Sequence, residues 1–469
     1  MLTWLSAGGA GPLGWTELRE NVHGPLFSLI LHGWMRIAGD AEWALRLPSA
    51  VFSIATVPAM AWLAREWLGR DAGIAAVWIA AGSPFLHWYG QEARNYALLI
   101  LCVCISTAQL LRLVRHPRAG ITWGYLLAAA AGMLSNLSFV LLAPLHLAFW
   151  IGPREGRPAR LARAALIALG LALIASPWAV SAWRIWDWNR LHPAREAPTA
   201  EAPLRGATTF HAGAVPFAAY AFSVGYGFGP SLRELRTEGP VAAVRRHAFA
   251  VAVATVVCGA LAWIGLREVR RRGRLGATLL WLLVPAVAVS YMALQNFKVF
   301  HPRYAAVAAP AWLLLFAAAF VVLRPRGRWL AGIALGAMWS MSIWNLAFDP
   351  DHRREDYRTA AARIRAQAQP GEQVLAVYSQ EPMEYYMRGA LPIRPLWLGL
   401  VAEPARLDST LDAVLAGAAG TWVVLSREQD LDPDGVFARR LESRYPQAAR
   451  FETNGVKIWR LTPRAEDVN

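Results

Sequence analysis

Charged residues are scarce in this sequence, and lysine is almost missing. Only 17% of the 469 residues are charged, whereas 56% are hydrophobic and the mean hydropathy is +0.30. The only lysines are Lys298 and Lys457, so arginine supplies nearly all the positive charge behind the net +15. The apolar residues form long blocks that a soluble domain could not bury, so the composition predicts a membrane protein.

Cysteine is also rare, and a cleavable signal peptide is missing. Cys102, Cys104 and Cys258 lie inside apolar blocks, without the even number of a disulfide framework or a metal-like spacing with histidine. We therefore expect them to be packing residues. Residues 1–11 carry no basic residue and only a short, glycine-rich apolar part, so membrane insertion is expected to use internal spans.

Blocks of apolar residues recur along the first three quarters of the chain, and each is long enough, or nearly long enough, to cross a bilayer as a helix. They cover 42–64, 72–88, 94–112, 121–134, 136–151, 163–182, 247–266, 276–293, 304–323 and 329–347. The pair that meets at Ser135-Asn136 is the shortest. The pattern predicts about ten crossings.

Arginine gathers in alternate loops, and this sets the predicted orientation. The arginine-rich segments are 65–70, 112–118, 154–163, 267–274 and 324–328. Positively charged loops stay in the cytoplasm, so we expect the turns at 87–95 and 295–304, the loop 183–246 and everything after Asn345 to face the periplasm. This topology explains the charge better than nucleic-acid binding does, and no nucleic-acid partner is expected.

The loop 183–246 departs from this pattern, because it contains eight arginines and an apolar stretch over 212–228. A crossing there would move every later segment to the other side and put the cluster 267–274 outside. We therefore expect a re-entrant or interfacial segment.

After Asp349 the apolar blocks give way to short alternating elements. Helices are predicted at 353–367, 381–388, 407–416 and 437–443, and strands at 373–377, 421–425 and 457–461. The expected fold class is an α-helical polytopic membrane protein with a C-terminal soluble α/β domain. A multi-span module would cover 1–348, with outer loops at 1–41 and 183–246, and a periplasmic α/β domain would cover 349–469.

Several short motifs follow one another in the predicted outer segments. They are Glu20–Phe27 with Leu31–Trp34, Glu42 with Arg46–Ser49, Ser83–Phe85 with Tyr89–Tyr96, Phe300–Tyr304, and Arg354–Arg358. Their order resembles the GT-C glycosyltransferases of the family-39-like group, relatives of the protein O-mannosyltransferases and of the aminoarabinose transferase that modifies lipid A. Each motif alone is weak, but together they extend from residue 20 to residue 361.

The resemblance implies a multi-pass enzyme of the bacterial inner membrane that uses a polyprenyl-phosphate sugar donor. It would move one hexosyl or pentosyl group to a hydroxyl of a glycan, lipid or protein acceptor at the extracytoplasmic face, with inversion. Such an enzyme needs cations at the level of the lipid headgroups and a carboxylate that takes the acceptor proton. The candidate catalytic residues are Glu20 and Glu92, and the candidate substrate-binding residues are His23, Arg94, Tyr96, Lys298, His301, Arg303 and Tyr304.

Most of these candidates also have a purely structural interpretation. Arg94 and Glu92 suit a plain ion pair at a helix start, and His301 and Arg303 suit headgroup anchors. His23 before a Gly-Pro turn suits the stiff entry to a helix. Residues 354–358 are more typical of the solvated face of an amphipathic helix, so they are not included in the predicted site.

One family feature is missing. In the family that this sequence resembles, an Asp-Glu after the first span supplies the general base, and neither that pair nor that span precedes His23. We expect Met1 to be an internal start of a longer chain; the alternative is a shortened, inactive scaffold. In the chain as it stands, Glu17 or Glu20 would act as the base, ahead of Glu92.

Two further alternatives concern function and metal. A transporter or flippase of polyprenyl-linked glycans would show polar or broken helices near mid-membrane and often an internal repeat. The sequence shows no repeat, and its polar residues gather in the outer loops. A divalent metal ion stays open as a cofactor, although no cluster of ligands has a convincing spacing.

Overall fold

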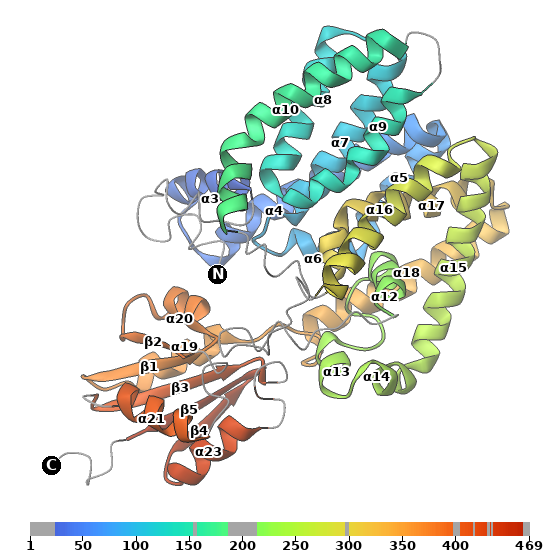
Figure 1. The fold of residues 1–469 in the computed structure, drawn as a ribbon. Coiled ribbons are helices and arrows are strands. Elements are labelled where there is room, and N and C mark those ends of the chain that lie inside the picture. Colours follow the sequence, from blue (N-terminus) through green and yellow to red (C-terminus); the bar gives the residue numbers. More distant parts are fainter. Residues whose placement is uncertain are drawn as a thin grey trace.

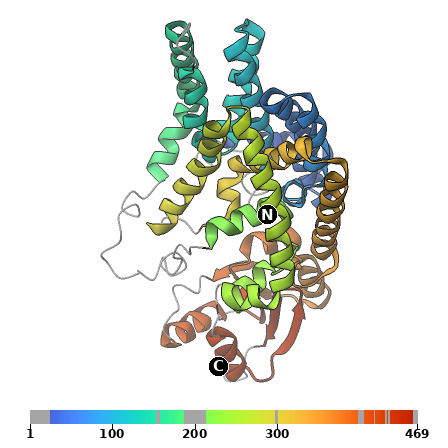
Figure 2. The ribbon, with the colours of Figure 1, turned by 90° about the vertical axis from the view of Figure 1, so that its right-hand side faces the viewer.

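The computed structural model describes residues 24–152, 157–185, 213–295, 300–396, 404–415, 418–428, 432 and 435–462. Helices dominate as far as residue 348, and a small sheet domain follows (Figure 1). Figure 2 shows the same arrangement from the side, with the strands beyond one end of the helices. The predicted fold class, a polytopic helical membrane protein with a C-terminal α/β domain, is confirmed.

The helical module is built from long apolar helices joined by short ones. Its elements are α3 (Pro25–Ala38), α4 (Glu42–Leu68), α5 (Arg70–Gly82), α6 (Pro84–Gly90), α7 (Tyr96–Arg115), α8 (Ala119–Ser135), η1 (Leu137–Leu142), α9 (Ala143–Ile151), α10 (Arg157–Ile185), α12 (Ala214–Val224), α13 (Leu232–Thr237), α14 (Pro240–Arg246), α15 (Ala248–Arg271), α16 (Leu275–Leu294), η3 (Pro302–Ala308), α17 (Ala309–Val322) and α18 (Pro325–Phe348). Helices α7 and α17 bury most of their residues, whereas the other candidate spans bury less than half of theirs. Large apolar side chains such as Ile54, Trp78 and Val256 stay exposed on the outside, as lipid contact requires.

Seven described helices are long and apolar enough to cross a membrane, against the ten predicted crossings. They coincide with seven of the predicted blocks, whereas 72–88, 121–134 and 136–151 form shorter helices. The break in 72–88 lies at Ser83-Pro84, where Ser83 caps the new helix α6 and Pro84 is its first residue. Asn136 similarly separates α8 from η1, and its side chain accepts a hydrogen bond from the Ser138 N–H at 2.9 Å.

The apolar stretch 212–228 does not form a span. Its described part is α12, an 11-residue helix that packs against α6, η3 and α17. The Trp312 indole donates to Ser223 Oγ at 2.8 Å, and the Trp339 indole donates to the Ser223 carbonyl at 2.7 Å. These contacts hold α12 inside the bundle at the end where α6 and η3 lie.

The C-terminal domain is a five-stranded sheet with helices on both faces. Its elements are α19 (Tyr357–Gln367), β1 (Glu372–Val377), α20 (Gln380–Met387), β2 (Ile393–Leu396), α21 (Pro404–Leu415), β3 (Gly420–Ser426), α23 (Val436–Arg444), β4 (Ala449–Thr453) and β5 (Val456–Leu461). The strand order is β2-β1-β3-β5-β4, in which β1 pairs in parallel with β2 and β3, and β5 pairs antiparallel with β3 and β4. Helices α19 and α20 cover one face and α21 and α23 the other.

Each predicted element of this domain has a counterpart, but strands β2 and β4 were missed. Both are short edge strands: β2 contains Pro395, and β4 is largely exposed, so neither carries the apolar signal of a buried strand. Helix α19 also starts later than predicted, because the Asp356 carboxylate caps it by accepting from the Thr359 N–H at 3.0 Å.

The sheet domain docks on the end of the bundle where α3 and α4 meet. Glu42, the first residue of α4, forms ion pairs with Arg46 and with Arg358 of α19, and it accepts a hydrogen bond from the Tyr386 hydroxyl at 3.0 Å. Arg388 forms an ion pair with Asp40 in the turn between α3 and α4. Glu42 therefore links the helical module to two helices of the sheet domain.

Close packing of α15 on α17 generates a first prediction. A Cβ at Gly265 would come within 1.9 Å of the Leu315 carbonyl oxygen. We expect Gly265→Ala to lower the stability of the detergent-solubilised protein by about 1–3 kcal/mol, since the two backbones must separate. Thermal unfolding measures this loss. Gly259→Ala, where nothing lies within 4 Å, is the control, and equal loss in both variants would contradict the packing argument.

Docking through Glu42 generates a second prediction. We expect Glu42→Gln to speed amide exchange in α20 by about tenfold, because the domain loses its ion pairs to the bundle. Hydrogen–deuterium exchange followed by mass spectrometry measures this. Glu66→Gln is a matched control: Glu66 lies at the other end of α4, has the same 17% side-chain exposure and pairs with Arg115. Unchanged exchange in the Glu42 variant would show that other contacts hold the domain.

Candidate active site

A cavity of roughly 600 Å³ lies between the sheet domain and the helical module and is lined by residues of both. Three parts of the chain line it: the start of α4, the turn from Trp88 to Arg94, and residues 352–359 that lead into the sheet domain. The first turns of α20 close its remaining side through Glu381 and Tyr386. Glu92 and Arg94, two of the predicted site residues, both line this cavity.

The turn between α6 and α7 is held by α4 and by the end of α8. The Ser49 hydroxyl donates to the Arg94 carbonyl at 3.1 Å, and the Asn95 side-chain amide donates to the Ser135 carbonyl at 2.5 Å. Asn136 in turn donates to the Asn95 side-chain oxygen at 3.4 Å. These bonds satisfy polar groups where α8 ends, and they fix the direction of Glu92 and Arg94.

Glu92 and Arg94 form a loose pair rather than a closed one. The Arg94 Nε lies 3.5 Å from a Glu92 carboxylate oxygen, and their side chains are 29% and 19% exposed. By contrast, Glu42 is engaged by two guanidinium groups and a tyrosine hydroxyl. Of these two carboxylates in the cavity, Glu92 is therefore the one with more freedom to accept a proton from a ligand.

Arg303 lies at the same end of the bundle, at the start of η3. Its guanidinium donates to the Tyr304 hydroxyl at 3.0 Å, and its backbone N–H donates to His301 Nδ1 at 3.2 Å. Its Nε is shielded from solvent and meets no hydrogen-bond partner, and no carboxylate lies within ion-pair distance among the described residues. An enclosed cation without a counter-ion is costly, so this position suits an anionic ligand.

His301 is not a second cation in this arrangement. Burial, and then the positive charge of Arg303, lower the pKa of His301 well below its usual range. The ring is therefore neutral near pH 7, and its Nδ1 accepts the hydrogen bond from the Arg303 amide. Arg303 carries the charge, and His301 orients the backbone that holds it.

Tyrosines join Arg303 to the cavity turn. The Tyr89 and Tyr226 hydroxyls lie 2.9 Å apart, and the Tyr89 and Tyr96 rings are 5.1 Å apart. Tyr96 lies within electrostatic range of both Arg303 and Arg94. Phenol groups thus link the enclosed guanidinium to the turn that lines the cavity.

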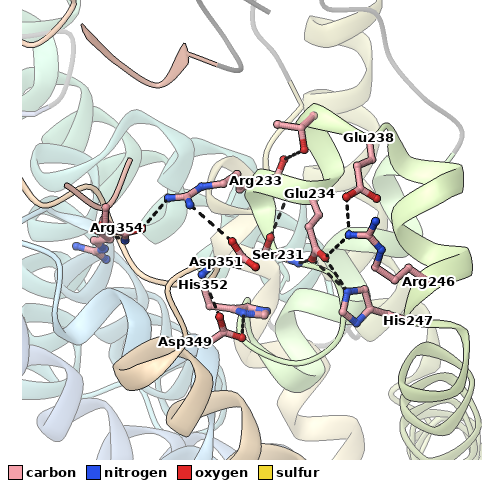
Figure 3. A network of polar contacts seen from close by, with 12 residues as sticks. Ser231, Arg233, Glu234, Glu238, Arg246, His247, Asp349, Asp351, His352 and Arg354 are labelled. Carbon is pink, nitrogen blue, oxygen red and sulfur yellow. Dashed lines mark hydrogen bonds and ion pairs between the residues drawn. The ribbon is translucent and has the colours of Figure 1, made fainter. Parts of the chain in front are cut away.

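A polar network fixes the linker that closes the cavity (Figure 3). His352 lies within hydrogen-bond distance of the Asp349 carboxylate at 3.0 Å and of the Gly229 carbonyl at 3.2 Å. Arg233 of α13 lies 3.7 Å from the Asp351 carboxylate. The linker is therefore tied to the segment between α12 and α13 just before it lines the cavity.

Helix α13 is itself stabilised by charge. Ser231 and Glu234 form a capping box, and Glu234 also contacts His247 at 3.0 Å (Figure 3). Burial favours the neutral carboxyl, but the hydrogen bonds from His247 and Ser231 prevail and lower the pKa of Glu234 to about 2. Glu234 stays ionised at neutral pH, so α13 presents Arg233 to the linker from a fixed position.

Several predicted site residues come together at this end of the bundle. Glu92 and Arg94 line the cavity, whereas Tyr96, His301, Arg303 and Tyr304 lie behind it. Glu20, His23 and Lys298 lie outside the described residues, as does Glu17. Among the described residues, no group of three His, Cys, Asp or Glu side chains could hold a metal ion.

The cavity also contains residues that the sequence interpretation left out. The sequence pattern predicts a solvated helix face at 354–358, but these residues line the cavity, and the Arg354 guanidinium lies 4.3 Å from the centroid of the Trp88 ring. Glu42 belongs to one of the family motifs but is not among the predicted site residues. The motif order is the sequence signal that could have found them, since Glu42 and residues 354–358 are both part of the family motifs.

Comparisons with known proteins place this geometry in context. Residues 22–183 match the model of the dolichyl-phosphate-mannose-protein mannosyltransferase family. ArnT from Cupriavidus metallidurans in the apo state is similar over 94% of this chain and 89% of that chain, with 14% identity and a TM-score of 0.56. ArnT bound to undecaprenyl phosphate gives 13% identity and a TM-score of 0.53 over the same shares.

A third solved structure is more distant. The oligosaccharyltransferase AglB from Archaeoglobus fulgidus, in complex with an inhibitory peptide and a dolichol-phosphate, covers 96% of this chain and 67% of that chain, with 13% identity and a TM-score of 0.50. No curated protein sequence matches. At these identities the structural likeness concerns the fold, and the sequence match concerns the segment 22–183. Together they show a GT-C type fold for the chain and a likeness to the mannosyltransferase family over residues 22–183.

Proposed function

We propose that this protein transfers a hexosyl or pentosyl group from a polyprenyl-phosphate donor to a hydroxyl acceptor at the extracytoplasmic face of a bacterial inner membrane. The observation that carries the proposal is Arg303, an enclosed guanidinium that has tyrosine contacts but no carboxylate partner among the described residues. A phosphate at the end of a lipid chain supplies the missing counter-charge.

The level of Arg303 in the bundle supports a lipid-linked donor. Arg303 is the second residue of the segment Pro302–Val322, which is long and apolar enough to span the membrane, so we expect its guanidinium near the level of the lipid headgroups. Tyr96 and Tyr304 would flank the phosphate, and Arg94 would approach it from the cavity. His23 and Lys298, outside the described residues, complete the proposed substrate-binding set.

The orientation follows from the arginine-rich helix ends. Arg115 pairs with Glu66 at 2.8 Å, and Arg272 donates to the Leu68 carbonyl, so three predicted cytoplasmic loops meet at one end of the bundle. The sheet domain and the cavity lie at the other end of α4. By the positive-inside rule, that end faces the periplasm.

In the proposed reaction, the acceptor hydroxyl attacks the anomeric carbon from the side opposite the phosphate. The bond from the anomeric carbon to the phosphate oxygen breaks, polyprenyl phosphate leaves with the electron pair, and the configuration inverts. A carboxylate takes the hydroxyl proton, and cations stabilise the leaving phosphate. Glu92 is the loosely paired carboxylate of the described cavity, and Glu20 is the other proposed base.

Ligands bound in the neighbouring structures support the donor class. One ArnT structure contains undecaprenyl phosphate and the AglB structure contains a dolichol-phosphate. Both ligands are polyprenyl phosphates. The AglB structure also contains an inhibitory peptide.

Replacing Arg303 tests the phosphate site. We expect Arg303→Ala to weaken binding of undecaprenyl phosphate by about 100-fold, because the charge-assisted hydrogen bonds to phosphate are lost. Arg303→Lys should keep part of the affinity. The affinity of each variant is measured by titrating undecaprenyl phosphate into the purified protein in detergent and recording the rise in its unfolding temperature.

Arg328→Ala is the control for charge and for folding. Arg328 donates to the Leu323 and Val321 carbonyls at a helix end that carries one of the predicted cytoplasmic clusters, so binding should be unchanged. Equal affinity in the wild type and in Arg303→Ala would overturn the phosphate assignment.

The reaction itself is tested by incubating the purified protein with a panel of polyprenyl-phosphate sugars. Absence of sugar release from all of them would overturn the proposed reaction.

Glutamine substitutions distinguish the two proposed bases. If Glu92 takes the proton, Glu92→Gln should lower kcat by about 100-fold to 10,000-fold, with little change in the KM for the donor. The same measurement on Glu20→Gln is the comparison. Full activity in Glu92→Gln combined with inactive Glu20→Gln would assign the base to Glu20.

A further inference from the structure

The carboxyl ends of the parallel strands form the edge of the sheet domain that faces the cavity. The strand order there is one that forms ligand-binding crevices in other sheets. The parallel strands β1, β2 and β3 have β1 in the middle. Helix α20, which follows β1, covers one face of the sheet, whereas α23, the next described helix after β3, covers the other. The connections thus diverge between β1 and β3, and doubly wound sheets bind ligands at the carboxyl ends of strands where this happens.

The backbone at this edge is strained at two matching positions. Tyr378 directly follows β1 with φ of 51°, and Arg427 directly follows β3 with φ of 53°. Residues with side chains rarely adopt this left-handed region, and such strain gathers at functional sites. The Ser379 hydroxyl donates to the Val424 carbonyl at 3.1 Å, which joins the end of β1 to β3.

This edge positions side chains that line the cavity. Helices α19 and α20 both begin here, and the cavity is lined by Tyr357 and Thr359 from the first and by Glu381 and Tyr386 from the second. Trp88 of α6 also lines it. Aromatic rings and polar groups therefore face the same space.

The charges that line the cavity are balanced. The carboxylates belong to Glu42, Glu92, Glu355, Asp356 and Glu381, and the guanidinium groups to Arg46, Arg94, Arg353, Arg354 and Arg358. Five negative and five positive groups favour a neutral ligand with many donors and acceptors over a polyanion. The sheet edges β2 and β4 do not line the cavity, so a peptide could not join the sheet there as an added strand.

We propose that this wall of the cavity binds the sugar hydroxyls of a neutral carbohydrate acceptor, a step that deepens the proposed function and rests on it. Glu381 accepts hydrogen bonds from the hydroxyls, and the ring of Tyr386 contacts the apolar side of the sugar. The wall thereby selects the acceptor class, while Arg303 holds the donor phosphate at a separate position.

The test measures acceptor binding without transfer. Saturation-transfer NMR on the purified full-length protein would use p-nitrophenyl disaccharides of glucose, mannose and galactose as probes, with undecaprenyl phosphate titrated separately. We expect at least one disaccharide to bind, and Glu381→Ala to weaken that binding at least tenfold. Glu384→Ala is the matched control, since Glu384 lies in the same helix, pairs with Gln380 and does not line the cavity.

Failure of this inference is separable from failure of the proposed function. Equal disaccharide binding in wild type and Glu381→Ala would overturn the acceptor wall, as would binding of a serine-containing peptide or a phosphorylated glycolipid but of no disaccharide. Undecaprenyl phosphate should bind equally well to wild type, Glu381→Ala and Glu384→Ala. If it binds to none of them, the proposed function fails, whatever the disaccharides do.

Discussion

The structure depends on one constraint, the need to pair every backbone polar group that lies within the bilayer. Long helices meet this need along their length, so irregular backbone is confined to helix ends. In this chain the break at Ser83, the turn before Tyr96, the start of η1 and the start of η3 lie at one end of the bundle. Asn95 and Asn136 satisfy the carbonyl and amide groups that the breaks expose. The polar residues of the candidate site therefore lie where the helices are interrupted.

Two cationic environments with different properties result. Arg303 is enclosed among tyrosines and has no carboxylate partner among the described residues, so it is suited to an anion. The guanidinium groups that line the cavity are balanced by carboxylates, which makes that space polar but close to neutral. Under the proposed function, this separation would let one protein hold a phosphate and a neutral ligand without competition between them.

The sheet domain is part of the site rather than an appendage. Glu42 connects α4 to α19 and α20, and the network around Arg233 and His352 ties the linker to the helical module. The domain therefore closes the cavity from a defined position. Its own fold directs the strained ends of β1 and β3 towards the membrane module.

The sequence by itself determined the fold class and most elements, because long apolar blocks and alternating short ones are local patterns. It did not show that the blocks 72–88, 121–134 and 136–151 form short helices rather than full spans. A single serine, proline or asparagine inside an apolar block changes the mean hydropathy of that block only slightly. The motif order also indicated Glu92, Arg94 and Arg303. Only the tertiary structure decided that Glu42, Arg354 and Tyr386 belong to one cavity, because contacts between residues more than 250 positions apart leave no trace in local composition.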